Sequence, residues 1–344
     1  MSVPVNVDNF ARAESDRMFA SLAKEAGGVN RLSHRRAPTS VDAQPVIRMN
    51  RDTLYSSVIL DISEDATLTI PDGGERYVSV MVVNQDHYIN RVFHEPGEHV
   101  LTVDEFDTPW VAVAARILVD PSDPDDVATV NALQDGLAVE AASSKPFEAP
   151  EYDSESLDAT RAALLGLARG LTGFGRAFGA KSDVDPIRHL LCTAAGWGGL
   201  PDSEAQYVGV DPREPVGEYR LTVRDVPVDG FWSISVYNAD GYFEPNDRNA
   251  YSVNNITATP NDDGSVTVHF GGDDDRPNLL PIMEGWNYTV RLYRPRPEIL
   301  DGTWTFPAIE PVRGVMTALR GEAVLTAMRP PAGGQVQSGR PGQR

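Results

Sequence analysis

One polar segment carries the residue types best suited to chemistry. Residues 45–57 read Pro-Val-Ile-Arg-Met-Asn-Arg-Asp-Thr-Leu-Tyr-Ser-Ser, which places an arginine, an amide and a carboxylate between two apolar runs. Successive side chains of a strand point to opposite faces, so Arg48, Asn50 and Asp52 share a face wherever the chain is extended. Buried polar groups of this kind are costly unless they satisfy one another or a ligand. Residues 50–56, which we call the polar segment, are therefore the first candidate site.

Two interpretations of the polar segment involve no catalysis. In one, Arg48 or Arg51 pairs with Asp52 in a buried ion pair that fixes the break between two strands. In the other, Arg48, Asn50 and Ser56 bind a small polar or carbohydrate-like molecule. The sequence does not decide between a structural role and a binding role.

A catalytic interpretation also stays open. Asp52 would act as general base or acid, Tyr55 as proton donor, and Arg51 would hold an anionic group of the substrate. Ser56 and Ser57 are weaker candidates for a nucleophile, because neither stands in a Gly-x-Ser-x-Gly motif. The sequence has no phosphate-binding glycine loop and no dinucleotide fingerprint, so the enzyme we expect here is a hydrolase without an organic cofactor.

Three histidines near residue 90 form a second, weaker candidate. Asp86 and His87 begin the predicted strand 86–93, and His94 and His99 flank residues 95–98, which predict a hairpin loop. Histidines and a carboxylate on neighbouring strands could hold a divalent metal. Their spacing matches no metal signature, and an exposed hairpin end is the simpler explanation. We therefore favour no metal and predict no cofactor.

Four residues of the second half could line a ligand cleft. Trp232 and Tyr237 lie in a predicted strand, where core packing is the default role of aromatic side chains. Together with Asn246 and Asn278, they would also suit a sugar or another polar small molecule.

The elements that must position these residues are mostly strands. Period-2 alternation and turn residues predict strands at 46–49, 54–62, 66–70, 76–83, 86–93, 99–103 and 109–119, and again at 205–210, 217–224, 230–238, 251–259, 264–270 and 286–294. Helical spacing and capping residues predict helices at 7–26, 123–137, 156–172 and 185–196.

This pattern predicts a mainly β protein, α+β overall, with two sandwich-like or barrel-like domains. The predicted parts are an N-terminal helix and lead-in, a first β domain, a helical connecting segment that bridges the two, a second β domain, and an extension that is disordered at its end. Their boundaries are 1–34, 35–140, 141–204, 205–312 and 313–344.

Composition limits the partners of this chain. The 344 residues are 41% hydrophobic and 23% charged, with a net charge of −20. Nucleic acids and anionic membranes both require a basic surface, so neither is an expected partner. A single cysteine, Cys192, and an N-terminus without signal-peptide character predict a cytoplasmic protein. We expect a small-molecule ligand, and a homo-oligomer is compatible with the sequence.

Several motifs resemble a bacterial pair of domains. The polar segment, Arg76-Tyr77, Val119-Asp-Pro and Asn131-Ala-Leu-Gln resemble domain of unknown function 1254. The second half resembles domain of unknown function 1214, which usually follows it, through Phe231-Trp-Ser-Ile-Ser-Val-Tyr, Asn246, Tyr251-Ser252, Asp263-Gly-Ser, Asn278-Leu-Leu-Pro and Arg291-Leu-Tyr-Arg-Pro. The resemblance covers about residues 35–312. Asn278-Leu279 departs from the pattern, in which a tryptophan commonly follows the asparagine. The resemblance implies two β-rich domains with a helical segment, and no defined chemistry.

Overall fold

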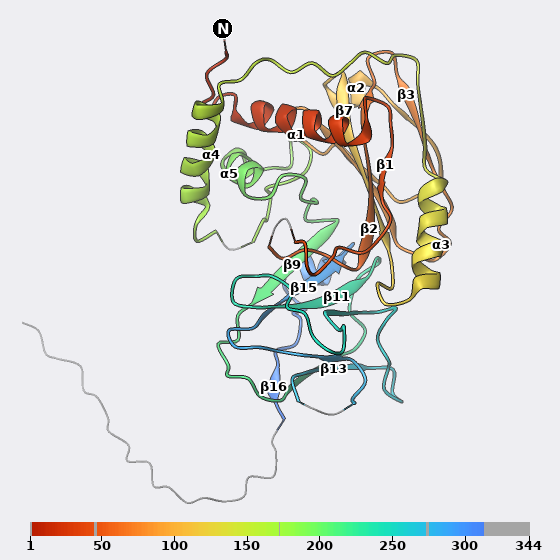
Figure 1. Cartoon of the computed structure of the whole chain (residues 1–344), viewed down its shortest axis with the longest axis vertical. Coiled ribbons are helices and arrows are strands. Elements are labelled where there is room, and N and C mark those ends of the chain that lie inside the picture. The colour runs from red at the N-terminus through yellow and green to blue at the C-terminus, as the bar shows by residue number, and fades with distance from the viewer. Residues whose placement is uncertain (1, 45–46, 172, 273–274, 313–344) are drawn as a thin grey trace, which may run out of the picture. The chain divides into compact units, whose positions relative to one another are not determined.

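Two antiparallel sheets pack face to face in the first half of the chain, as the computed structural model shows for residues 2–44, 47–171, 173–272 and 275–312 (Figure 1). The larger sheet has the strand order β1 (Ser33–Arg35), β2 (Thr53–Asp61), β7 (Trp110–Leu118), β4 (Val78–Asn84) and β5 (Arg91–Phe93). The smaller one has the order β6 (Gly97–Leu101), β3 (Ala66–Ile70) and β8 (Ala138–Ala141). Leu54, Val113 and Leu68 belong to the apolar core between them.

A second pair of sheets forms the second half. One has the order β12 (Ser252–Asn254), β11 (Trp232–Tyr237), β15 (Asn287–Tyr293) and β9 (Ala205–Val210). The other has the order β14 (Leu279–Leu280), β13 (Val266–Phe270), β10 (Tyr219–Val223) and β16 (Glu310–Pro311). Their core includes Leu221, Ile234 and Val290, and the short helix α6 (Pro297–Leu300) follows β15. The predicted mainly β, α+β class is confirmed, and the described part of the chain contains sandwiches rather than a closed barrel.

The longer helices lie on opposite faces of the larger first sheet (Figure 1). On one face, α1 (Phe10–Ala26), α4 (Ser154–Ala168) and α5 (Pro186–Gly196) contact one another. On the other face lies α3 (Pro124–Asp135), and α2 (Val103–Phe106) is a single turn. The predicted caps are present: Asp123 accepts from the Asp125 amide at 2.9 Å, and Gly27 has a φ of 77° at the end of α1. Nowhere in the four described ranges is there a helix with the length and apolar character of a membrane span.

The two β domains meet through the outer faces of the five-stranded sheet of the first and the β12–β11–β15–β9 sheet of the second. Ile59 and Met81 of the first domain share a buried cluster with Phe231 and Tyr293 of the second, and Phe19 of α1 joins them. Residues of β2, β7 and β4 that point away from the first core therefore face β9, β11 and β15, which is where the polar residues discussed below are placed.

Two strand predictions are wrong. The predicted strand 46–49 does not form, because Ile47 and Arg48 lie in a turn and Arg48 has a φ of 54°, while Val46 lies outside the described residues. The segment 95–98 is no hairpin loop, because β5 and β6 belong to different sheets. At Gly97, whose φ is 116°, the chain crosses from one sheet to the other.

Three further predictions differ from the structure or lie beyond it. The predicted strand 86–93 shortens to β5, since residues 86–90 are occupied by a turn and a loop. The predicted strand 251–259 shortens to the three residues of β12. The extension predicted at 313–344, disordered at its end, lies outside the described residues.

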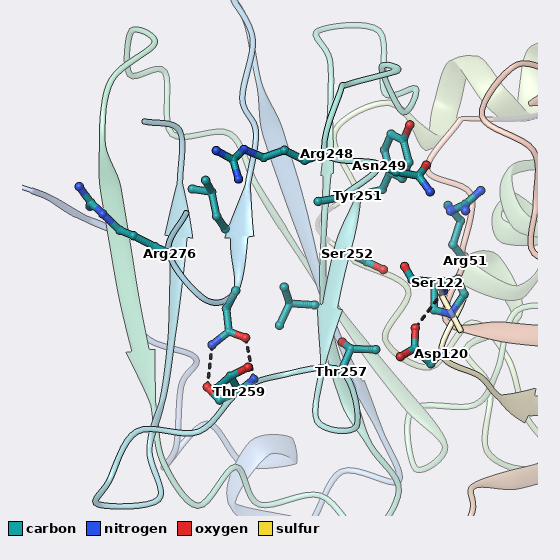
Figure 2. Close-up of a pocket in the computed structure, with 15 residues that line it drawn as sticks. Arg51, Asp120, Ser122, Arg248, Asn249, Tyr251, Ser252, Thr257, Thr259 and Arg276 are labelled. Atoms are coloured by element: carbon teal, nitrogen blue, oxygen red, sulfur yellow. Dashed lines mark hydrogen bonds between the residues drawn. The ribbon is translucent and has the colours of Figure 1, made fainter. Parts of the chain in front are cut away.

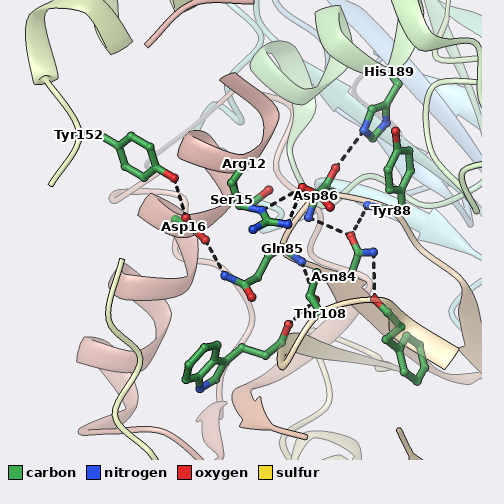
Figure 3. A network of polar contacts seen from close by, with 12 residues as sticks. Arg12, Ser15, Asp16, Asn84, Gln85, Asp86, Tyr88, Thr108, Tyr152 and His189 are labelled. Atoms are coloured by element: carbon green, nitrogen blue, oxygen red, sulfur yellow. Dashed lines mark hydrogen bonds and ion pairs between the residues drawn. The ribbon is translucent and has the colours of Figure 1, made fainter. Parts of the chain in front are cut away.

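A buried polar network holds α1 to the turn after β4 (Figure 3). Asp16, 1% exposed, accepts hydrogen bonds from Gln85 Nε2 and from the Tyr152 hydroxyl, both at 2.9 Å. Arg12 forms an ion pair of 2.7 Å with Asp86. Burial raises the pKa of Asp16, although the two hydrogen bonds oppose that rise. The helix therefore buries a carboxyl where its apolar spacing predicted only a hydrophobic stripe.

His87 is buried next to this network in its neutral form. Its Nε2 accepts from the Gly198 amide at 2.9 Å, and its Nδ1 lies 2.8 Å from Thr193 Oγ1. Since Thr193 Oγ1 donates its own proton to the His189 carbonyl, the ring proton is assigned to Nδ1. Burial, reinforced by His189, holds the pKa of His87 well below its ordinary value.

We expect His87 to make folding sensitive to mild acid. Its folded pKa is depressed, so below about pH 6.5 the unfolded chain takes up a proton that the folded protein excludes. The free energy of unfolding should therefore fall as the pH drops, by up to about 1.4 kcal/mol per pH unit from this residue. Urea unfolding between pH 7.5 and about 5 should show a shallower decline for His87→Gln than for the parent. A matched change at the partly exposed His99 should leave the slope as it is, and equal slopes for the parent and His87→Gln would contradict the assignment.

Candidate functional site in the cleft between the β domains

The second β domain fixes the backbone that leads into the polar segment. Arg291 of β15, 4% exposed, donates from Nη2 to the carbonyls of Arg48 and Met49 at 2.9 and 3.2 Å. The same nitrogen lies 2.7 Å from the Tyr237 hydroxyl, which itself donates to the Met49 carbonyl at 2.7 Å. Burial disfavours the charged form of Arg291, but the phenols of Tyr237 and Tyr293 and the Asp52 carboxylate hold its pKa above the ordinary value.

Asp52 is also held by the second domain. It is 0% exposed, and its Oδ1 accepts from Ser252 Oγ at 2.8 Å and from Asn254 Nδ2 at 3.0 Å. Both donors belong to the edge strand β12. The second carboxylate oxygen, Oδ2, has no hydrogen-bond partner among the described residues. Asp52 therefore links the domains through a carboxylate that is only half satisfied.

The structure does not bring Arg48, Asn50 and Asp52 together on one face. Arg48 donates to Asn287 Oδ1 at 2.8 Å, whereas Asn50 donates to the Tyr293 hydroxyl at 3.0 Å. Because the backbone of Arg48 is left-handed, the extended conformation that would align the three side chains is interrupted. Among the described residues, neither Arg48 nor Arg51 forms an ion pair with Asp52.

The Arg51 side chain instead lines a pocket of about 360 Å³ between the two domains (Figure 2). Its guanidinium donates to the Thr39 carbonyl and lies over the Tyr251 ring, 5.1 Å from the centroid. Ser252 lines the same pocket, with its hydroxyl turned to Asp52. The other lining residues are Asp120, Pro121, Ser122, Arg248, Asn249, Ala250, Val253, Thr257, Thr259, Arg276, Asn278 and Leu279.

Two candidate residues of the polar segment, Tyr55 and Ser56, do not line this pocket. Tyr55 faces Arg116, whose guanidinium carbon lies 5.8 Å from the ring centroid. Ser56, 3% exposed, lies 2.8 Å from His34 Nδ1 and accepts from Gln134 Nε2 at 3.1 Å. Tyr55, expected as the proton donor beside Asp52, and Ser56, expected to bind a ligand, therefore contact other residues and not their predicted partners.

Of the four residues predicted in the second half, only Asn278 lines this pocket. Its side chain is held by the Thr259 amide at 2.7 Å and the Thr259 carbonyl at 2.8 Å, so it shapes the wall. Trp232 and Tyr237 are buried at 6% and 0% exposure, and Asn246 closes its own loop onto Ala250.

The histidines of the weaker metal hypothesis do not converge. His87 is buried beside Thr193, His94 lies 2.7 Å from Glu204, and His99 contacts the Glu95 carbonyl at 2.9 Å. Across the residues that the structure describes, no group of three histidine, cysteine or carboxylate side chains could hold a metal ion.

Comparison with known proteins identifies the family. A family described as protein of unknown function (DUF1254) matches residues 29–141, and one described as protein of unknown function (DUF1214) matches residues 210–297. The chain belongs to this two-domain family. The DUF1254 part therefore contains the polar segment, and the DUF1214 part contains β12 and β15, which hold it.

A solved structure shares the fold. The VPA0106 protein from Vibrio parahaemolyticus has a TM-score of 0.70 and 18% identity, over 89% of this chain and 98% of that one. An uncharacterised protein from Burkholderia cenocepacia has a TM-score of 0.46 and 16% identity, over 83% of each chain. A search of curated proteins finds no match. The first likeness shows a common fold for the DUF1254–DUF1214 pair and assigns it no activity.

Sequence reasoning missed the DUF1214 residues that complete the site. Ser252, Asn254 and Arg291 carry the contacts to the polar segment. Arg291 had a recognisable signal, since an arginine inside the apolar run of β15 is costly to bury without partners. Ser252 was marked only as part of the Tyr251-Ser252 motif of the family resemblance, and Asn254 had no signal, because short polar residues at a strand edge are common.

We expect Asp52→Asn to destabilise the DUF1254–DUF1214 pair. The amide removes the negative charge that strengthens both hydrogen bonds and places a donor where Oδ2 has no partner. The free energy of unfolding should drop by roughly 1.5–3 kcal/mol, measured by urea unfolding. Asp42→Asn, at an exposed carboxylate before the segment, should change it by less than about 0.5 kcal/mol. An equally small effect at Asp52 would show that the carboxylate is not needed for stability.

Proposed function

We propose that this protein binds a small hydroxylated carboxylate in the cleft between its DUF1254 and DUF1214 parts. The observation that carries the proposal is Arg51, a nearly buried cation that opens on the cleft and forms no ion pair within the described chain. A cation taken out of water gains most from an anion that approaches it closely. The lone Cys192 supports a reducing compartment such as the cytoplasm as the place of binding.

The charge of the lining supports an anionic ligand. The charged residues that line the pocket are three arginines, Arg51, Arg248 and Arg276, and one carboxylate, Asp120. Arg248 pairs with Asp275 at 2.8 Å and Arg276 with Glu218 at 2.9 Å, so their charges are partly compensated. Burial lowers the pKa of Arg51, opposed by Tyr251 and Asp52, yet an arginine remains protonated at neutral pH. In a chain of net charge −20, Arg51 adds to this lining a cation that no carboxylate of the described residues pairs with.

The remaining polar groups support a ligand rich in hydroxyls. The wall presents hydroxyls and amides from both domains, among them Ser122, Asn249 and Thr257. Apolar lining is limited to a few side chains such as Leu279, which does not suit a large hydrophobic ligand. The volume of about 360 Å³ lies at the small end of ligand sites.

The carboxylate requirement can be tested with matched probes. D-glucuronate and D-glucose share a pyranose ring and its hydroxyls and differ at C6, which is a carboxylate in one and a hydroxymethyl group in the other, and citrate and tartrate extend the set. We expect one or more of the acids, but not glucose, to bind in calorimetry at fixed ionic strength. Arg51→Gln should weaken binding by roughly tenfold to a hundredfold, because it removes a charge-assisted contact. Arg213→Gln, at an arginine whose side chain is 86% exposed, removes the same charge and should have no effect. Equal binding to the parent and Arg51→Gln would refute the proposal.

The hydrogen bond between Ser252 and Asp52 favours a second candidate, hydrolysis of a small ester in the same cleft. Ser252 Oγ would attack the ester carbonyl carbon while its proton passes to Asp52, which then returns that proton to the departing alcohol. Water would release the acid from the acyl-serine and restore Ser252. In this reaction Asp52 keeps the role of general base, and Ser252, rather than Tyr55, is its partner.

Hydrolysis can be measured with p-nitrophenyl acetate. Ser252→Ala should abolish turnover above the buffer rate, whereas Ser203→Ala, at an exposed serine outside the pocket, should retain it. Asp52→Asn should lower the rate by about 10²–10⁴-fold, as expected for loss of a general base. Turnover that survives in Ser252→Ala would exclude this mechanism.

A further inference from the structure

Two rows of three side chains face each other where the domains meet. On the DUF1254 side, the strand register places Tyr55 of β2, Arg116 of β7 and Ser79 of β4 side by side. On the DUF1214 side, it places the same residue types in the same order across β9, β15 and β11: Tyr207, Arg291 and Ser233. Each domain thus presents an arginine at the centre of a sheet face, with a tyrosine on one side and a serine on the other.

The two arginines differ in how they are satisfied. Arg291 donates to two carbonyls and to the hydroxyls of Ser235 and Tyr237. Arg116 donates from Nη2 to the Gly198 carbonyl at 3.0 Å, and its buried Nη1 has no hydrogen-bond partner among the described residues. A buried guanidinium nitrogen without an acceptor is costly.

Further unpaired hydroxyls lie beside Arg116. Ser79, 0% exposed, is its neighbour across the strand pair, and its Oγ is buried without a partner in the described chain. The hydroxyl of Tyr77, 7% exposed, also has no partner in full hydrogen-bond geometry, and it interacts with Ser79 and with the charges of Arg116 and Glu204. Three groups able to donate hydrogen bonds, one of them cationic, therefore lie near one another, and no carbonyl or carboxylate of the described chain accepts from Arg116 Nη1 or from the two hydroxyls.

The surrounding groups do not neutralise Arg116. The carboxylate acting on this cluster, Glu204, is paired with His94 at 2.7 Å. Burial raises the pKa of Tyr77, Tyr207 and Tyr293, so these phenols stay neutral at physiological pH. The missing partner is thus both an acceptor and a negative charge.

We propose that a small monovalent anion, a halide or a carboxylate of formate size, binds between Arg116 Nη1, Ser79 Oγ and the Tyr77 hydroxyl. It would compensate, at the junction of the two domains, the arginine that the chain leaves half satisfied. The site is separate from the Arg51 cleft, because it rests on β7 and β4 and uses none of that pocket's lining residues. The binding proposed for the cleft can therefore fail without affecting this one.

Bromide is the probe, because it scatters anomalously and substitutes for chloride. Crystals of the full chain soaked in sodium bromide should show an anomalous peak within hydrogen-bond distance of Arg116 Nη1. In solution, bromide should raise the melting temperature above that measured in the sodium salt of MES, a bulky sulfonate, at equal ionic strength. Sodium formate is a second probe, which tests whether the site binds a carboxylate. If it raises the melting temperature and displaces the bromide peak, the site accepts carboxylates, and if it does neither, the site is selective for halides.

Variants decide whether the effect belongs to this site. Arg116→Met should remove the bromide-specific rise, whereas Arg213→Met, with the same loss of charge at an exposed position, should keep it. Should Arg116→Met fail to fold, Ser79→Ala serves instead and should weaken bromide binding by roughly tenfold to a hundredfold. A rise that persists in these variants, or crystals with no anomalous peak at Arg116 and only water there, would overturn the proposal.

Discussion

The arrangement of this protein depends on how the DUF1214 sheet holds the polar segment of the DUF1254 domain. Arg291 binds the carbonyls of residues 48 and 49, and Ser252 and Asn254 bind the carboxylate of Asp52. These groups are buried, so each would cost free energy if its partner were removed. The contacts therefore fix the direction in which the segment enters β2, and with it the position of Arg51 on the cleft.

Positive charge gathers at this junction although the protein as a whole is acidic. Arg51, Arg116 and Arg291 come from three different strands or loops, and only Arg291 has its donors largely satisfied by the chain. A low-dielectric junction strengthens any interaction with an anion and makes an uncompensated cation costly. The same physical condition thus supports an anionic ligand in the open cleft and a small anion in the buried rows.

Much of the fold could be predicted from local patterns. The helix caps at Asp123 and Asp185, the glycine at the end of α1 and the alternation in β2, β7 and β15 each depend on neighbours close in sequence. The prediction failed where a distant contact decides the backbone. Arg48 is left-handed because its amide bonds Gly241 and its carbonyl bonds Arg291, neither of which the local pattern contains. The assumed hairpin at 95–98 failed for a related reason, since only the packing of two sheets shows that the chain changes sheet there.

By itself, the sequence determined the family, the β-rich class and the segment around which the site is built, because these are encoded in residue types and their local spacing. The tertiary structure decided which residues act together. Arg48, Asn50, Asp52 and Tyr55 are close in sequence, yet their partners are spread over β15, β12 and β7. Ser252 meets Asp52 across 200 residues. The pairing of side chains across two facing sheets depends on register and packing, and no local period encodes it.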